Sequence, residues 1–519
     1  MTARTDIAAT AAGLDHPRTA FNAALALLAG FTALRLFVLM IDPNSLYADE
    51  TQYWLWSQSL DWGYFSKPPM IAWVIAATTA LFGDADWAVR LAAPILHLVS
   101  ASFLGLAAAR LFGPRAGFWA AALWMLMPAV WLSSIIIATD AVMMAGWSLG
   151  LYALIRLRER PHWGWAIALG AAAGWAFLSK YATVYFLIGT GIAILVDKPA
   201  RRALLSLQGA AALSVFGAII SGNLLWNAAN EFATVSHTAA NANWQGSLFN
   251  LEELLQFIGD QFGVFGPITF ATLIAAVVIA IRRSRPGQEE RPLLMLAGFV
   301  VPALVIVAGQ AFISRAHANW AASAYGAGTL LTAWLLTHRA DWRRFLLYGS
   351  VGLHFLLGAA FLSFAASPQL TDAAGRANDF KRIREWPATA EAIETVVRET
   401  GVDIVAFDNR NDFHQTQRYG PDIPAQLYMW LRQNSAHNFA EAAWPLPVGV
   451  EGPVLIVSER PREVPVMRAD FAVMEPAGEI VIDLGGGIER RYQLFLAEGY
   501  RPVERTPAFE AEIAETASR

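Results

Sequence analysis

Two neighbouring carboxylates, Asp49 and Glu50, lie in the aromatic segment "SLYADETQYWLW", just after an apolar stretch long enough to cross a membrane. A third, Asp140, begins the apolar run in "IIIATDAVMM". A carboxylate in such a place can take a proton from a reacting hydroxyl. The same residues have simpler uses, because acids at a helix N-terminus complement the helix dipole and Asp often caps a helix. The residues alone leave both interpretations open.

The composition places these acids in a membrane protein. Of the 519 residues, 56% are hydrophobic and 15% are charged, which is too apolar for an ordinary soluble enzyme. Stretches of about 20 apolar residues, the length of a membrane helix, recur until Phe364 and then stop. We therefore expect a cytoplasmic N-terminal tail at 1–20, a polytopic α-helical membrane domain at 21–365 and a soluble domain at 366–519.

Two further features of the composition exclude classes of chemistry. The chain has no cysteine, so disulfides, thiolate catalysis and cysteine-bound metals are excluded. The formal net charge of -4 argues against a nucleic acid partner.

The apolar pattern predicts about eleven membrane helices, the first at 21–41, followed by an outer loop at 42–90. The others are expected near 91–109, 116–134, 140–155, 163–179, 183–196, 203–222, 263–281, 293–312, 319–337 and 345–365.

Basic residues collect in alternate loops, which is typical of cytoplasmic loops. These residues are Arg110 and Arg115; Arg156, Arg158 and Arg160; Lys198, Arg201 and Arg202; Arg282, Arg283, Arg285 and Arg291; Arg339, Arg343 and Arg344. Together with Arg4 and Arg18, they place the N-terminus inside the cell. Eleven crossings then place the C-terminal domain outside, in the periplasm of a Gram-negative cell. All three acids face this outer side of the inner membrane.

Five cations break the charge pattern because they face outward: Arg35, Lys67, Arg90, Lys180 and Arg315. Charges in or near a membrane are costly and commonly mark functional sites. Each one alone could be an interfacial residue whose charged end reaches water. Five cations on the same side as three acids indicate a ligand with both a phosphate and a reacting hydroxyl.

Glycosyl transfer from a lipid phosphate fits such a set. A carboxylate can serve as the base for the acceptor hydroxyl, and Lys or Arg can stabilise the charge that develops on the phosphate leaving group. Because no soluble nucleotide sugar is available outside the membrane, a polyprenyl-phosphate sugar is the expected donor.

The motifs "YADETQYWLW", "DWGYFSKPPMIAW", "WAVRLAAP" and "ATDAVMM" resemble the GT-C glycosyltransferases that use polyprenyl-phosphate sugars, relatives of protein O-mannosyltransferases and of the lipid A aminoarabinose transferase. The segments "NLLWNAANEFATVSHTAANANW" and "SRAHANWAASAY" are similar to the subgroup of lipopolysaccharide core and lipid A galacturonic acid transferases. The resemblance covers the chain to about residue 340.

The resemblance implies roles for individual positions. Asp49 would be the base that deprotonates the acceptor, Glu50 would support it, and Asp140 would be the second catalytic acid. Lys67 matches a lysine associated with the lipid phosphate. The further candidates for binding substrate or phosphate are Arg35, Tyr64, Arg90, Lys180, Tyr181, Asn227, His237, Asn243, Arg315, His317 and Asn319. Amides and histidines of this kind also have structural uses.

The need for a metal stays open. A divalent cation requires several oxygen ligands, which Asp49 and Asp140, with Glu50, would supply if the fold brought them together. Lys and Arg can neutralise a monophosphate leaving group without a metal. We therefore expect no obligatory cofactor, with a divalent cation as an option.

The C-terminal region reads as a small α/β domain. Strand-like runs occur at 402–408 and 452–459, and helical stretches at 388–399 and 424–434. The polar segment "DNRNDFHQTQRY" follows the first strand-like run at its carboxyl end, where α/β folds often bind ligands. We nevertheless favour a solvated loop for this segment.

The expected function is transfer of a single sugar from a polyprenyl-phosphate donor to a hydroxyl or phosphate of a lipid or lipopolysaccharide such as lipid A, on the outer face of the inner membrane. The same chemistry on a protein or cell-wall polysaccharide is the nearest alternative. A lipid-linked sugar flippase is an alternative of another class, but it should carry acids in mid-helix and a repeat of its two halves.

Overall fold

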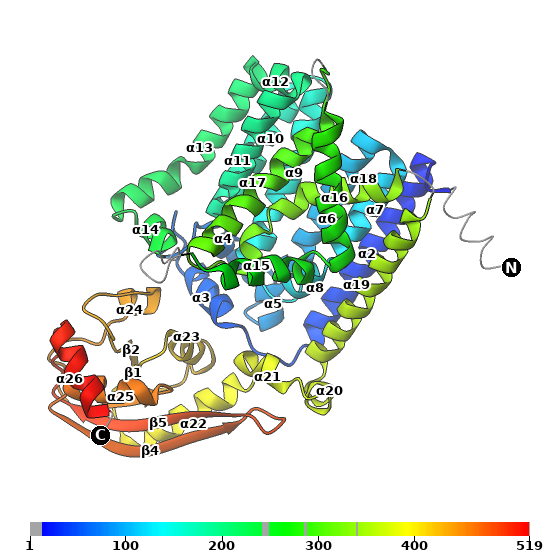
Figure 1. The fold of residues 1–519 in the computed structure, drawn as a ribbon. Helices are drawn as coiled ribbons and strands as arrows, with labels where there is room; N and C mark the ends of the chain where they lie inside the picture. The colour runs from blue at the N-terminus through cyan, green and yellow to red at the C-terminus, as the bar shows by residue number, and fades with distance from the viewer. Residues whose placement is uncertain (1–12, 241–248, 285–287, 339–340, 518–519) are drawn as a thin grey trace. The chain divides into compact units, whose positions relative to one another are not determined.

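A computed structural model describes residues 13–240, 249–284, 288–338 and 341–517 (Figure 1). Asn243 and three of the basic loop residues, Arg4, Arg285 and Arg339, lie outside these described residues. The chain divides into two compact units. The membrane unit comprises Met1–Ile41 and Ser59–Ser363, and the C-terminal unit comprises Asp42–Gln58 and Phe364–Arg519.

The membrane unit is helical, and a helix occupies each of the eleven stretches that the apolar pattern predicts (Figure 1). Its elements are α2 (Pro17–Ile41), α4 (Met70–Phe82), α5 (Asp86–Arg90), α6 (Ala92–Phe112), α7 (Pro114–Leu126), α8 (Pro128–Ser133), α9 (Thr139–Glu159), α10 (Trp163–Ser179), η1 (Tyr181–Thr183), α11 (Val184–Val196), α12 (Lys198–Leu204), α13 (Leu207–Ala229), α14 (Ala233–Ala240), α15 (Leu251–Val264), α16 (Pro267–Arg283), α17 (Pro292–Ile313), η2 (Ala318–Ala321), α18 (Ala324–Thr337) and α19 (Arg343–Ala366), whose last three residues belong to the C-terminal unit.

Several of these helices are long and apolar enough to cross a membrane, which makes the chain a multi-pass membrane protein. Among the described residues, five spans meet both criteria: α2, α5 continued by α6, α13, α17 and α19. The number rises to seven if α11 with α12 and α15 with α16 each form one bent span. The predicted total of about eleven crossings stays a prediction.

α15 and α16 meet at a bend of 108°. Two residues at the junction explain the bend: Gly266 lies between the helices, and Pro267 is the first residue of α16. Gly266 has a φ of 94°, a backbone conformation that disfavours residues with a Cβ. A Cβ there would also lie 1.8 Å from Nε2 of His354. Pro267 then starts the new helix at a position where its missing N–H costs nothing.

Small residues let the membrane helices pack closely, as is common inside membranes. A Cβ on Gly146 of α9 would lie only 2.7 Å from the carbonyl oxygen of Ala172 in α10. Large apolar side chains instead cover the outside of the outer helices, for example Phe37 in α2, Leu225 in α13 and Leu356 in α19. The membrane unit therefore has a tight interior and an exterior suited to lipid.

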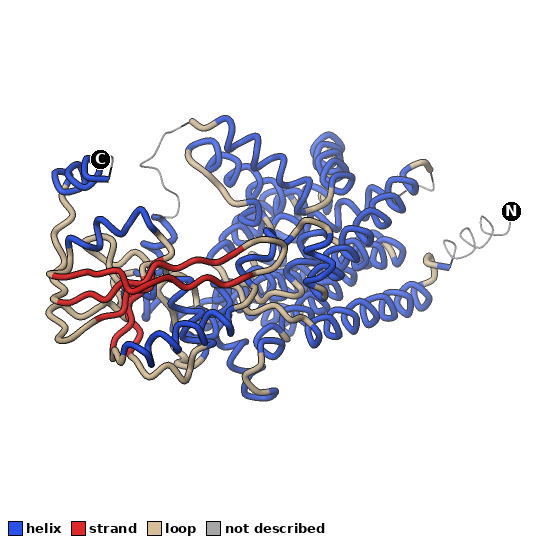
Figure 2. Tube along the Cα trace, turned by 90° about the horizontal axis from the view of Figure 1, so that it is seen from below, coloured by secondary structure: helices blue, strands red, loops and turns tan. Residues whose placement is uncertain are grey.

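The C-terminal unit contains one five-stranded mixed sheet with the strand order β2-β1-β3-β5-β4 (Figure 2). The strands are β1 (Ile404–Phe407), β2 (Gln426–Met429), β3 (Val454–Ser458), β4 (Val473–Asp483) and β5 (Glu489–Glu498). β1 pairs in parallel with β2 and β3, whereas β5 is antiparallel to β3 and β4. The central strands β1 and β3 are almost wholly buried.

The remaining helices of the C-terminal unit are short. They are α3 (Ala48–Ser57), α20 (Pro368–Ala373), α21 (Ala377–Phe380), η3 (Lys381–Ile383), α22 (Trp386–Thr400), α23 (Arg410–Tyr419), α24 (Phe439–Ala443), η4 (Pro461–Glu463), α25 (Val464–Ala469) and α26 (Pro507–Ala517).

Two sequence predictions for this unit are wrong. The stretch 424–434 was expected to be helical, but it contains β2 because residues 426–429 pair in parallel with β1. Sheet pairing here overrides the local helical pattern. The segment after β1 is not a solvated loop either, because it forms α23 with Asp412, Phe413 and His414 buried. The predicted strands at 402–408 and 452–459 contain β1 and β3, and the predicted helix at 388–399 corresponds to α22.

The first part of the predicted outer loop groups with the C-terminal unit and not with the membrane unit. The backbone N–H of Ser45 donates to the carbonyl oxygen of Ile383 over 2.8 Å. The amide of Asn44 donates to the carbonyl oxygen of Ala365 over 2.9 Å. Residues 42–58, which carry Asp49 and Glu50, are therefore held by the chain's last third.

Candidate active site

The two acids at the start of α3 occupy different surroundings. Glu50 is 1% exposed, and its Oε2 accepts a hydrogen bond of 2.8 Å from the backbone N–H of Tyr47. Glu50 thus satisfies one of the free N–H groups near the start of the helix. The Asp49 side chain is 48% exposed, so it is the acid of this pair that a substrate can reach.

Asp49 has a cationic neighbour that the sequence did not reveal. Nη2 of Arg410, the first residue of α23, lies 3.5 Å from Oδ1 of Asp49. Nη1 of the same guanidinium donates to Oε1 of Gln52 over 3.3 Å. Arg410 stands in the segment "DNRNDFHQTQRY", which the sequence marked as a possible ligand site without linking it to Asp49.

In the membrane unit, two of the predicted residues, Lys180 and Asn319, bind the carboxylate of a third, Asp140. Nζ of Lys180 donates to both oxygens of Asp140, over 2.7 and 2.9 Å. Nδ2 of Asn319 donates to Oδ2 of Asp140 over 3.1 Å. The side chains of Asp140 and Lys180 are each 18% exposed. Asp140 lies in the first turn of α9 and Lys180 directly follows α10, so two helix ends bring the pair together.

This arrangement indicates what Asp140 can do. Both oxygens of Asp140 accept from the Lys180 ammonium. These charge-assisted bonds fix the direction of the ammonium. Asp140 is therefore placed to hold a cation at this point of the membrane unit.

A hydrogen-bonded chain starts at the phenol of Tyr181, the residue after Lys180, and includes the amides of Asn223 and Asn227 in α13. The hydroxyl of Tyr181 donates to Oδ1 of Asn223 over 2.9 Å, and Nδ2 of Asn227 donates to that hydroxyl over 3.0 Å. Nδ2 of Asn223 donates to the carbonyl oxygen of Trp62 over 2.7 Å. Oδ1 of Asn227 is buried without a hydrogen-bond partner among the described residues. Asn223 was missed, although it lies four residues before Asn227 on the same side of α13.

The loop with Lys67 is attached to α14, the helix that follows α13. The hydroxyl of Thr234 donates to the carbonyl oxygen of Tyr64 over 2.6 Å. The backbone N–H of Tyr64 donates to the carbonyl oxygen of Lys67 over 3.1 Å, and its hydroxyl donates to the carbonyl oxygen of Ser59 over 3.0 Å. Burial raises the pKa of the Tyr64 phenol to about 12, so the phenol stays a donor. Lys67 itself is partly exposed.

Two of the predicted phosphate ligands are buried inside the helix bundle. Arg35 is fully buried, its Nη2 donates to the carbonyl oxygen of Met125 over 2.5 Å, and its guanidinium lies 4.7 Å from the ring centre of Trp131. Arg90, the last residue of α5, is 2% exposed. These positions suit helix packing, whereas a bound phosphate would need a path to them.

Two further candidates, Arg315 and His317, lie in an exposed segment. Arg315 and His317 are exposed residues between α17 and η2, and the ring of His317 packs edge-on against Trp320 with ring centres 5.4 Å apart. His237 lies in α14. Asn243 lies outside the described residues.

The acids do not form a metal cluster in the described part of the chain, where no three His, Asp or Glu side chains converge. Lys180 occupies both oxygens of Asp140, and Glu50 accepts from the start of its own helix. A cation bound by Asp140 would have to displace Lys180. Lys180 supplies a cation beside Asp140, an arrangement that suits a phosphate.

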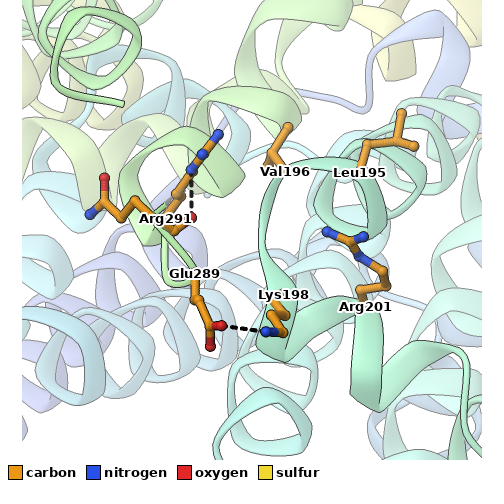
Figure 3. Close-up of a pocket in the computed structure, with 7 residues that line it drawn as sticks. Leu195, Val196, Lys198, Arg201, Glu289 and Arg291 are labelled. Carbon is orange, nitrogen blue, oxygen red and sulfur yellow. Dashed lines mark hydrogen bonds and ion pairs between the residues drawn. The ribbon is translucent and has the colours of Figure 1, made fainter. Parts of the chain in front are cut away.

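A cavity in the membrane unit is lined by other residues (Figure 3). Its lining includes Lys198, Arg201 and Arg291, with Lys198 paired to Glu289 (Figure 3). All of these belong to loops that the charge pattern predicts to be cytoplasmic. None of the predicted site residues lines this cavity, so it is not the candidate active site.

Comparisons with known proteins identify the family of the chain. Residues 66–226 match the family model of dolichyl-phosphate-mannose-protein mannosyltransferases. The chain is 34% identical to lipid A galacturonosyltransferase RgtD of Rhizobium johnstonii over 84% of this chain and 90% of the relative. It is 30% identical to lipopolysaccharide core galacturonosyltransferase RgtA of the same organism over 57% of this chain and 61% of the relative.

The fold also matches a solved structure. ArnT from Cupriavidus metallidurans, in the crystal structure bound to undecaprenyl phosphate, superposes with a TM-score of 0.62 at 18% identity, over 91% of this chain and 97% of ArnT. This similarity shows a shared fold. The extended identity to RgtD shows more: the chain is a glycosyltransferase, and it belongs to the GT-C membrane glycosyltransferase family that includes lipid A galacturonosyltransferase.

Proposed function

We propose that this enzyme transfers a single sugar from a polyprenyl-phosphate donor to lipid A on the outer face of the inner membrane. The observation that carries the proposal is the 34% identity to a lipid A galacturonosyltransferase over 90% of that protein. A uronic acid is accordingly the first sugar to test. The binding of undecaprenyl phosphate by ArnT, which has the same fold, supports a polyprenyl-phosphate donor.

Lys180 is the main candidate for the donor phosphate. Its ammonium group is fixed by Asp140, which Asn319 also contacts. Because both side chains are largely shielded from water, the attraction for a phosphate is stronger than at an open surface. Lys67 and the exposed Arg315 are the further cations that we assign to this phosphate, and Arg315 offers a planar fork for two of its oxygens.

Asp49 is the candidate base. The acceptor oxygen forms a bond to the anomeric carbon while the bond from that carbon to the phosphate oxygen breaks. The acceptor proton passes to the Asp49 carboxylate, and the polyprenyl phosphate leaves with both bonding electrons. Cations neutralise the charge that develops on the phosphate.

Mass spectrometry of lipid A tests this function in cells. A strain without the gene should lack one sugar on lipid A, and the wild-type gene should restore it, whereas the Asp49→Asn gene should not. A deletion strain with unchanged lipid A but an altered glycoprotein or cell-wall polysaccharide would contradict the proposed acceptor.

Cysteine labelling tests the orientation, because the chain has no native cysteine. A cysteine at Ala318, close to Arg315 and Asn319, should react with an impermeant thiol reagent from the periplasmic side. A cysteine at Pro161, in a basic loop, should react only after the membrane is opened. The reverse pattern would overturn the orientation and the donor argument with it.

A further inference from the structure

We propose that Arg410 of α23 is a positioning residue for Asp49, so that α23 forms part of the catalytic apparatus. The inference rests on the proposed function, in which Asp49 is the base. It adds a residue from the last quarter of the chain to a site that the sequence pattern places in the first outer loop.

The first support is that α23 holds the segment on both sides of Asp49. Nε2 of Gln415 donates to the carbonyl oxygen of Leu46 over 2.7 Å, and the hydroxyl of Tyr419 accepts from the backbone N–H of Leu46 over 2.7 Å. The guanidinium of Arg418 lies 4.3 Å from the ring centre of Trp54. Asp49 lies between these anchor points, so α23 determines where the start of α3 can be.

The second support is that α23 is itself rigidly mounted. Phe413 is fully buried in the core of the sheet and packs against Phe407 and Trp444. The Tyr492 hydroxyl donates to Oδ1 of the buried Asp412 over 3.1 Å. The sheet thus fixes the position of α23, and α23 fixes the position of the start of α3.

The third support is the geometry of the Arg410 guanidinium. It contacts Asp49 at 3.5 Å and Gln52 at 3.3 Å, and its side chain is 43% exposed. A cation at this distance attracts the carboxylate without binding both of its oxygens. The second oxygen of Asp49 can therefore take the acceptor proton, while Arg410 limits the rotation of the carboxylate.

The test is a double-mutant cycle on the full-length enzyme with a synthetic polyprenyl-phosphate sugar and purified lipid A. Arg410→Ala should lower kcat by about 10- to 100-fold, the size expected when a catalytic group is misplaced by about 1 Å. The KM for the donor and the thermal midpoint should stay close to wild type, because exposed ion pairs contribute little to stability. Arg410→Lys should restore part of the activity, since it returns the charge.

The Asp49→Asn background separates positioning from a structural role. If Arg410 acts through Asp49, adding Arg410→Ala to Asp49→Asn should cause no further loss of the residual rate. Independent losses that multiply would overturn the inference. Arg398→Ala is the matched control, because Arg398 also lies in the C-terminal unit and pairs with Glu394 on an exposed helix face; it should leave kcat unchanged.

The cycle also distinguishes this inference from the proposed function. If Asp49→Asn itself retains wild-type turnover, the base assignment fails and the inference with it. If Asp49→Asn is inactive while Arg410→Ala has a normal kcat, the base assignment stands and only the inference is wrong. A raised donor KM in Arg410→Ala would also contradict it, because that result would make Arg410 a donor ligand.

Discussion

Each unit of the molecule contains a carboxylate paired with a cation, and the two pairs are built differently. In the membrane unit, Lys180 binds both oxygens of Asp140 at 2.7 and 2.9 Å, and both side chains are 18% exposed. In the C-terminal unit, Arg410 approaches one oxygen of Asp49 at 3.5 Å, and both side chains are more than 40% exposed.

The difference separates two kinds of catalytic work. A shielded carboxylate with both oxygens bound to a cation holds that cation in place, which suits a phosphate. An exposed carboxylate with a more distant cation is open to an acceptor hydroxyl. We therefore propose that the Lys180 pair serves the leaving phosphate and that Asp49 serves the acceptor.

Asp49→Asn should have the largest effect on rate. An amide keeps the shape of the side chain but cannot take the acceptor proton, and loss of a general base typically costs about 10²–10⁴ in rate. The variant should melt like wild type, because Asp49 is half exposed and its contact with Arg410 is long. Turnover kinetics on purified protein measure the loss, and Glu394→Gln serves as a carboxylate control. Near-normal turnover would remove Asp49 from the role of base.

Lys180→Ala should come next, because it removes a cation from the developing phosphate charge in a shielded place, a contribution of up to about 3–4 kcal/mol. It also leaves Asp140 without its counter-charge, so stability should fall. The double variant Lys180→Ala with Asp140→Ala should recover stability without recovering activity. Activity that returned together with stability would make the pair purely structural.

Asp140→Asn should have a smaller effect, about 10-fold on kcat/KM, which corresponds to one charge-assisted hydrogen bond. The asparagine can still accept one bond from Lys180, but it no longer fixes the direction of the ammonium. The loss should appear mainly in the KM for the donor. A loss confined to kcat with an unchanged donor KM would indicate a direct catalytic acid instead.

The smallest effect concerns stability in the C-terminal unit. Burial raises the pKa of the Asp412 carboxyl well above its usual range, so the folded state binds its proton more strongly than the unfolded state does. The stability that this proton contributes is present below the unfolded pKa of about 3.9 and is lost as the pH rises toward the folded pKa. Asp412→Asn should therefore raise the thermal midpoint at pH 8 and change it little at pH 4. Melting curves at the two pH values check the sign, and an equal shift at both would contradict it.

The positions of the helices could be predicted largely from sequence, and the contacts of the site could not. Long apolar runs in the sequence predict membrane helices, and each of the eleven predicted stretches contains a helix. The strand β2 was missed because its identity depends on pairing with β1, which lies about twenty residues earlier. Pairing across the chain leaves no local pattern.

At the site, too, the sequence indicated single residues but not the contacts between residues that lie far apart in the chain. Lys180 was singled out because it breaks the loop charge pattern, and Asp140 because it begins an apolar run. Their pairing joins positions 40 residues apart and needed the fold. Arg410 is 361 residues from Asp49, in a segment with no apolar or charge pattern that points to the first loop. Arg35 also breaks the charge pattern, and the fold adds that its guanidinium contacts Met125 and Trp131; its role as a phosphate ligand stays a prediction.

Direct binding of the donor to two variants tests the central claim most simply. The affinity of a labelled polyprenyl-phosphate sugar should be measured for wild type, Asp49→Asn and Asp140→Asn in the same detergent and without acceptor. Asp49→Asn should bind the donor like wild type although it does not transfer the sugar, and Asp140→Asn should bind it about 10-fold more weakly because Lys180 is no longer held. Weak binding by Asp49→Asn together with normal binding by Asp140→Asn would contradict the division of work between the two carboxylates.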